Sequence, residues 1–118
     1  MQYGATVFPK PPPELEWLAP WQRLDGAGEE FVAELRRELP DQHVLHGLLA
    51  AAAARRCDCD EVLFVTNDPI RPLAVVRLTW AGRKESDPRR PFTTLYKDWR
   101  DWARRCLRPD HENHDSDG

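Results

Sequence analysis

Apolar and polar residues alternate from Leu73 to Trp80, which is the pattern of a β-strand with two different faces. One face carries the row Ala74, Val76, Leu78 and Trp80. The other face carries Val75, Arg77 and Thr79. We therefore expect the first row to be buried and the second to be partly in contact with water, as in an antiparallel sheet.

Two further segments are predicted to pair as a hairpin. Residues 61–66 are rich in β-branched and aromatic side chains, which favour a strand. The five consecutive alanines at 50–54 favour a helix by propensity, but proline, glycine and a polar turn bound the segment closely. We predict a strand over 49–56, with a helix as the alternative.

Helical periodicity occurs in two segments. Residues 29–39 place apolar side chains on one face, namely Phe31, Val32, Leu35 and Leu39. The polar side chains of this helix are expected to face water, namely Glu34, Arg36, Arg37 and Glu38. A last helix is predicted over 95–107, with Thr93 or Thr94 as its N-cap and Pro109 ending it. Its apolar stripe is Leu95, Trp99, Trp102, Ala103 and Cys106.

A chain of 118 residues corresponds to one domain. Four prolines predict an extended arm over 1–13, followed by a single domain over 14–109 and an acidic, disordered tail over 110–118. We predict an α+β fold with a helix, a three-stranded antiparallel meander and a C-terminal helix, both helices on one sheet face. Trp80 should then share an interior with Trp99 and Trp102. Trp17 and Trp21 either fix the arm to this core or form an exposed aromatic patch.

The composition narrows the class of protein. The net charge of -3 provides no general reason to expect nucleic acid or an anionic membrane as a partner. Three cysteines do not make a disulfide framework. No apolar run is long enough to span a membrane, and the N-terminus lacks the features of a secretory signal. We therefore predict a cytoplasmic protein.

A metal or thiol site is one candidate for chemistry. The possible ligands are His43, His46, Cys57, Cys59, Cys106, His111 and His114. Structural zinc sites normally use spaced pairs such as C-x2-C, whereas Cys57 and Cys59 form C-x-C. A Cys–His nucleophile drawn from Cys57, Cys59, His43 and His46 would need a lowered thiol pKa and a positioned base. A plain hairpin turn explains the same residues.

Carboxylates and basic residues supply the other candidates. Acidic side chains occur in a predicted turn (Asp58, Asp60, Glu61) and on the last helix (Asp98, Asp101). Such carboxylates can act in acid–base catalysis, but acidic residues in turns also serve as local hydrogen-bond acceptors. A set of basic residues surrounds Trp80 in the sequence, namely Arg77, Arg83, Lys84, Arg89 and Arg90. Further candidates for the same basic surface are Arg104, Arg105 and Arg108. Trp and Arg dominate protein–protein contacts, and basic residues around an aromatic ring can also bind single-stranded nucleic acid.

Several segments together resemble a family of small bacterial proteins of unknown function. The shared pattern is AVVxLTWxGxxExDP at 74–88, TxxYxxWxxW at 93–102 and RCxxPDHE at 105–112, with further similarity at 45–47 and 59–64. The resemblance covers about 14–112 and implies the same fold, without an activity. Arg77 and Arg90 stand where the family pattern has His and Trp.

The sequence therefore predicts a non-catalytic cytoplasmic protein-binding module, an immunity-type or accessory factor, that contacts another protein through Arg77, Trp80, Arg83, Arg89 and Arg90. No cofactor, membrane or nucleic acid is expected as a partner, and self-association stays open. The alternative is a small thiol- or metal-dependent enzyme centred on His43, His46, Cys57 and Cys59. Convergence of those four side chains in a pocket would favour the enzyme.

Overall fold

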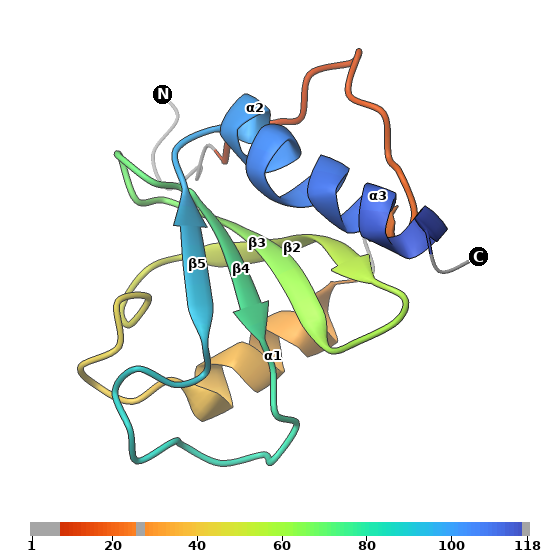
Figure 1. The fold of residues 1–118 in the computed structure, drawn as a ribbon. Helices are drawn as coiled ribbons and strands as arrows, with labels where there is room; N and C mark the ends of the chain where they lie inside the picture. The colour runs from red at the N-terminus through yellow and green to blue at the C-terminus, as the bar shows by residue number, and fades with distance from the viewer. Residues whose placement is uncertain (1–7, 26–27, 117–118) are drawn as a thin grey trace.

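The structure, a computed structural model, describes residues 8–25 and 28–116. Its centre is a five-stranded antiparallel sheet in which the strands lie in chain order (Figure 1). The strands are β1 (Trp21–Arg23), β2 (Ala50–Arg56), β3 (Glu61–Thr66), β4 (Leu73–Arg77) and β5 (Thr93–Tyr96). The predicted β2–β3 hairpin is confirmed. The prediction of only three strands is wrong, because β1 and β5 extend the sheet at its two edges.

Both edge strands are too short to show an alternating pattern. β1 has three residues and pairs with the end of β2, where Trp21 lies opposite Arg56. β5 has four residues, and its Thr94 lies opposite Val75 of β4. Thr93 and Thr94 therefore belong to a strand and do not cap the last helix as predicted.

The helices cover opposite faces of the sheet, which corrects the prediction that both lie on one face (Figure 1). α1 (Glu29–Glu38) lies on one side. A continuous C-terminal helix lies on the other and consists of α2 (Trp99–Trp102), a π-helical segment η1 (Ala103–Leu107) and α3 (Arg108–Ser116). Among the described residues, no helix is long and apolar enough to cross a membrane.

Each face of the sheet therefore has its own core. The core under α1 contains Leu35, Leu39, Leu45, Val62, Phe64, Ala74, Val76 and Leu78. The core under the C-terminal helix contains Trp21, Leu63, Val65, Leu73, Val75, Trp99, Trp102 and Leu107, among others. The expectation that one face of 73–80 would be partly wet is thus wrong for β4, because both of its faces are covered by helices. Trp80 lies beyond the end of β4 and belongs to neither core.

The last helix begins later and ends later than predicted. Asp98 caps it, since its side chain accepts the N–H of Asp101 at 2.7 Å. The helix continues past Pro109, the second residue of α3, which comes directly after the π-helical segment. In the wider turn of η1, the N–H of Arg108 reaches back five residues to the carbonyl of Ala103.

Residues 110–116, for which the sequence predicts disorder, lie in α3. Asp110 connects this helix to β1, because its Oδ2 accepts the indole N–H of Trp21 at 2.9 Å. The interpretation of Trp17 and Trp21 as residues that fix the arm to the core is confirmed. Trp21 is 1% exposed, and Trp17 packs against the same core.

Close packing of α1 on the sheet depends on small residues. A Cβ added to Gly28, at the N-cap of α1, would lie 2.7 Å from the Cβ of Ala52 in β2. The small side chains of the alanine run in β2 therefore allow the start of α1 to pack close to the sheet.

Candidate functional site

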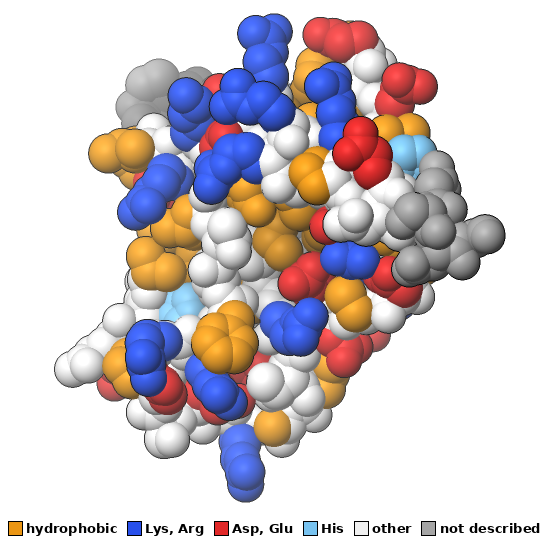
Figure 2. All heavy atoms as spheres, in the orientation of Figure 1, with side chains coloured by type: hydrophobic (Ala, Val, Ile, Leu, Met, Phe, Trp, Pro, Cys, Tyr) orange, Lys and Arg blue, Asp and Glu red, His pale blue; other side chains and the backbone are white. Residues whose placement is uncertain are grey.

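The connection between β4 and β5, residues 78–92, has no regular secondary structure, and we call it the β4–β5 loop. It contains four of the five residues that the sequence singles out for binding, namely Trp80, Arg83, Arg89 and Arg90. Arg77, the fifth, ends β4 immediately before it. The structure thus brings this set to one end of the sheet, where Figure 2 shows basic side chains around hydrophobic ones in the lower part of the view.

Two buried glutamates of α1 hold the start of this loop. The carboxylate of Glu38 accepts the N–H of Thr79 through both oxygens, at 3.0 and 3.1 Å. Its Oε2 also accepts the N–H of Trp80 at 2.8 Å. Glu34, one turn earlier, accepts the N–H of Gly82 at 3.0 Å. Carboxylates that accept backbone amides are among the stronger hydrogen-bond acceptors, so the loop backbone is well fixed.

The prediction that Glu34 and Glu38 face water is wrong. Their exposed fractions are 2% and 0%. Both lie on the stripe that also contains Phe31 and Leu35, at the spacing of one helix face. That spacing is the sequence signal for their burial. The charge of a glutamate nevertheless predicts a position on the solvent-exposed face of a helix, unless a buried hydrogen-bond partner is known.

The two carboxyls hydrogen-bond to each other, and their pKa values move apart. Burial, followed by the hydrogen bond with Glu34, raises the pKa of Glu38 above its ordinary value. The same hydrogen bond lowers the pKa of Glu34, and Arg37 contributes through an ion pair of 2.9 Å. The pair therefore retains one proton more readily than two separate glutamates would.

Trp80 is held in a conformation that bulky residues rarely adopt. Its φ is +58°, in the left-handed region that favours glycine. The residue is 42% exposed, and its ring makes an edge contact with Phe31, at 5.8 Å between ring centroids. A strained, partly exposed aromatic residue with a fixed backbone is typical of a functional position.

The basic residues of this set are exposed, and their contacts to acidic residues are few. Arg77 lies 3.7 Å from Glu61, and Arg89 pairs with Asp87 in the same loop at 3.1 Å. Arg90 lies over the ring of Phe92, which is itself 56% exposed. Arg83 is exposed. Exposed ion pairs of this kind are worth little, so these cations remain able to exchange their partners for those of another molecule.

The basic residues of the last helix form a separate group. Arg104 and Arg105 pair with Asp101, and Arg105 also lies over Tyr96 at the far end of β5. Figure 2 shows this group in the upper part of the view, apart from the β4–β5 loop.

His43 does not converge with Cys57. His43 lies beside β5, where its Nε2 is 3.0 Å from the carbonyl oxygen of Pro91. Cys57 lies beside β1, at the opposite edge of the sheet, and its N–H donates to the carbonyl of Pro20. Among the residues described, no group of three or more His, Cys, Asp or Glu side chains could hold a metal ion.

Each of these residues has a local explanation. The Nδ1 of His43 accepts the N–H of Leu45 at 3.0 Å, so both ring nitrogens are engaged in the loop. His46 lies 3.7 Å from Asp41 on the surface. Burial raises the pKa of the Cys59 thiol, which opposes formation of a nucleophilic thiolate. Burial also raises the pKa of the Cys106 thiol, to about 12.

The candidate carboxylates are likewise structural. Asp58 forms a bidentate ion pair with Arg56, with two hydrogen bonds of 2.9 Å. Asp101 is 6% exposed, accepts the N–H of Lys97 at 3.1 Å and pairs with Arg105. These contacts lower the pKa of both carboxyls.

Comparisons with protein-family models, with curated proteins and with solved structures give no match. The resemblance described above therefore stays a prediction, and function has to be argued from the site itself.

Proposed function

We propose that this chain is a non-catalytic protein-binding module, an immunity-type or accessory factor, and that the β4–β5 loop makes the contact. The observation that carries the proposal is the fixed, strained backbone of Trp80. Its φ of +58° costs free energy, and Glu38 holds it through a hydrogen bond of 2.8 Å. The result is an aromatic ring displayed in one orientation, which reduces the entropy that binding would otherwise cost.

The chemistry of the loop favours an acidic partner. Arg77 ends β4, and Arg83, Arg89 and Arg90 belong to the same loop as the partly exposed Trp80 and Phe92. Arg90 lies over the ring of Phe92. Trp and Arg supply a large share of the binding free energy in protein interfaces. Basic side chains at the rim of such a contact mainly increase the association rate and the salt dependence.

The arrangement of the thiols and imidazoles gives no support to the enzyme alternative. His43 and Cys57 lie at opposite edges of a five-stranded sheet, so this histidine is not within reach of the thiol of Cys57. A cytoplasmic location belongs to the same proposal and is supported by the three cysteines, all of which are free thiols.

The experiment is affinity capture with three baits: the wild-type chain, the double variant Trp80→Ala/Arg83→Glu, and Arg100→Glu as a control. Arg100 is exposed on α2, outside the loop. We expect an acidic protein that the wild type and the control retain, that the double variant loses and that nuclease treatment leaves in place. Equal retention by all three baits, or no specific protein at all, would contradict the proposal.

A further inference from the structure

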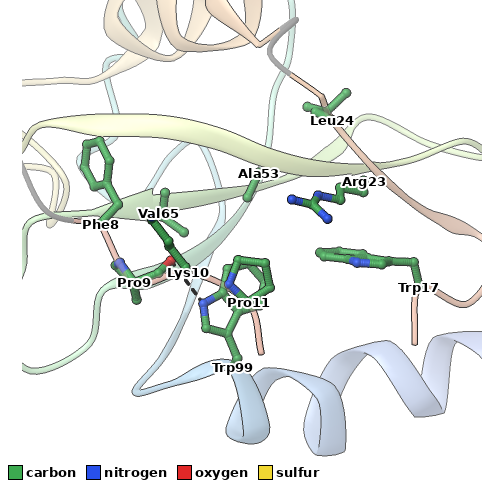
Figure 3. A pocket seen from close by; sticks show the side chains of 10 residues that line it. All are labelled: Phe8, Pro9, Lys10, Pro11, Trp17, Arg23, Leu24, Ala53, Val65 and Trp99. Atoms are coloured by element: carbon green, nitrogen blue, oxygen red, sulfur yellow. Dashed lines mark hydrogen bonds between the residues drawn. The ribbon is translucent and has the colours of Figure 1, made fainter. Parts of the chain in front are cut away.

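A second feature lies on the other side of the sheet, away from the β4–β5 loop. It is a cavity of about 460 Å³ between the N-terminal arm, β1, β2 and α2. Its apolar walls come from Phe8, Pro9, Pro11, Trp17, Leu24, Ala53, Val65 and Trp99 (Figure 3). This volume lies within the range of about 300–1,000 Å³ that is usual for small-molecule sites.

The arm forms one wall because a specific hydrogen bond holds it. The indole N–H of Trp99 donates to the carbonyl oxygen of Pro9 at 3.1 Å, shown as the dashed line in Figure 3. The rings of Trp17 and Trp99 meet edge to face at 5.9 Å between centroids. Trp99 is 5% exposed and Trp17 is half-buried, so Trp17 offers the larger aromatic surface to a bound ring.

The charged side chains that line the cavity are basic. Lys10 and Arg23 line it, and among the described residues no acidic side chain does. Figure 3 shows the guanidinium of Arg23 extending from β1 above the ring of Trp17 and toward the centre of the cavity. Its Nε pairs with Asp25 at 3.5 Å, but the two side chains are 55% and 86% exposed, so this contact is weak.

We propose that this cavity binds a small aromatic carboxylate. The ring would lie among Trp17, Trp99 and Val65, and the carboxylate would meet Arg23, with Lys10 nearby. A planar guanidinium donates two parallel hydrogen bonds to a carboxylate, which fixes the orientation of the acid. A neutral ligand of the same shape would lose this contact while keeping the apolar one.

The test uses 3-phenylpropanoate and its neutral amide as probes, followed by NMR of the indole N–H groups. We expect the acid to shift the signals of Trp17 and Trp99, with a dissociation constant on the order of 1 mM, and to leave Trp80 unshifted. The amide should bind about three- to fivefold more weakly, which is the upper range for one exposed charge pair.

Two variants separate the charge from the cavity. Arg23→Gln should weaken the acid to the level of the amide, while the matched control Arg89→Gln in the β4–β5 loop should have no effect. Ala53→Leu should fill the cavity and abolish binding of both probes, and unchanged signals of Trp21 and Trp80 would show that the fold is retained.

Three outcomes would overturn the proposal. The first is that neither probe shifts Trp17 or Trp99 at several times the expected dissociation constant. The second is equal binding of the acid and the amide, which would show an apolar site without anion recognition. The third is a shift confined to Trp80, which would place the probe on the β4–β5 loop.

Discussion

The carboxylate of Glu38 accepts the backbone N–H of Trp80 at 2.8 Å across 42 positions of the chain. Glu38 is fully buried, whereas the ring of Trp80 is partly exposed. One buried acid of α1 therefore determines where an exposed ring of the β4–β5 loop is displayed.

Replacement of Glu38 should separate hydrogen bonding from charge. Glu38→Ala removes the acceptor of the Thr79 and Trp80 amides, and we expect a loss of about 2–4 kcal/mol in the free energy of unfolding. Glu38→Gln resembles the protonated acid, since its carbonyl can accept these amides and its NH2 can donate to Glu34, so the loss should be within about 1 kcal/mol. Urea denaturation measures both, and equal losses would show that the glutamine cannot replace the acid.

The pH dependence of stability should differ between the wild type and Glu38→Gln. The raised pKa of Glu38 means that the folded state binds its proton more tightly than the unfolded state does. Its contribution is therefore present below the ordinary glutamate pKa of 4.5 and is lost as the pH rises through the folded-state pKa. Glu34, with a lowered pKa, contributes above 4.5 and loses this contribution as the pH falls.

The wild type should thus lose stability relative to Glu38→Gln as the pH rises above about 4.5, because the glutamine has no proton to release. Urea denaturation of both proteins from acidic to neutral pH provides the measurement. Stability curves that stay parallel over this range would show that Glu38 does not titrate differently on folding.

The strain at Trp80 predicts an unusual order of stability. Trp80→Gly removes the cost of the left-handed conformation and the contact with Phe31, whereas Trp80→Ala removes the contact and keeps the strain. We expect the glycine variant to be the more stable of the two by about 1 kcal/mol, the reverse of the usual ranking. Thermal or urea denaturation of the two variants is sufficient, and a more stable alanine variant would contradict the strain.

Gly28 should resist substitution because of its distance from Ala52. An alanine Cβ there would lie 2.7 Å from the Cβ of Ala52 and 3.2 Å from its carbonyl oxygen. We expect Gly28→Ala to cost about 1–3 kcal/mol through overpacking. Adding Ala52→Gly should restore part of the loss, so the two changes should be non-additive in a double-mutant cycle of unfolding free energies. Additive changes in unfolding free energy would show that the contact with Ala52 is not the cause of the loss.

Asp110 should stabilise the end of the chain. It accepts the indole N–H of Trp21 at 2.9 Å and lies 3.3 Å from Arg56. We expect Asp110→Ala to cost about 1–3 kcal/mol, because the buried indole N–H loses its acceptor. The control Glu112→Ala changes an exposed acid two residues later and should be neutral. Equal effects of the two changes on urea denaturation would show that the contact is not important.

The pattern of residues alone determined much of the secondary structure. The start of α1 at Glu29 and β4 follow from local periodicity, since each segment is long enough to show it. The β2–β3 hairpin follows from the β-branched and aromatic residues of 61–66 and from the turn residues that bound the alanine run. The apolar stripe through Trp99, Trp102 and Cys106 likewise identified the buried face of the last helix. The sequence also placed the basic and aromatic residues of the candidate site within one continuous stretch.

Only the tertiary structure decided how these elements combine. β1 and β5 exist because neighbouring strands pair with them, which a segment of three or four residues cannot indicate by itself. The path of the chain between elements decides that the two helices pack on opposite faces of the sheet. This arrangement explains why β4 is buried on both sides. Glu34 and Glu38 are buried because amides more than forty positions away satisfy them, so their role follows from long-range contact and not from local pattern.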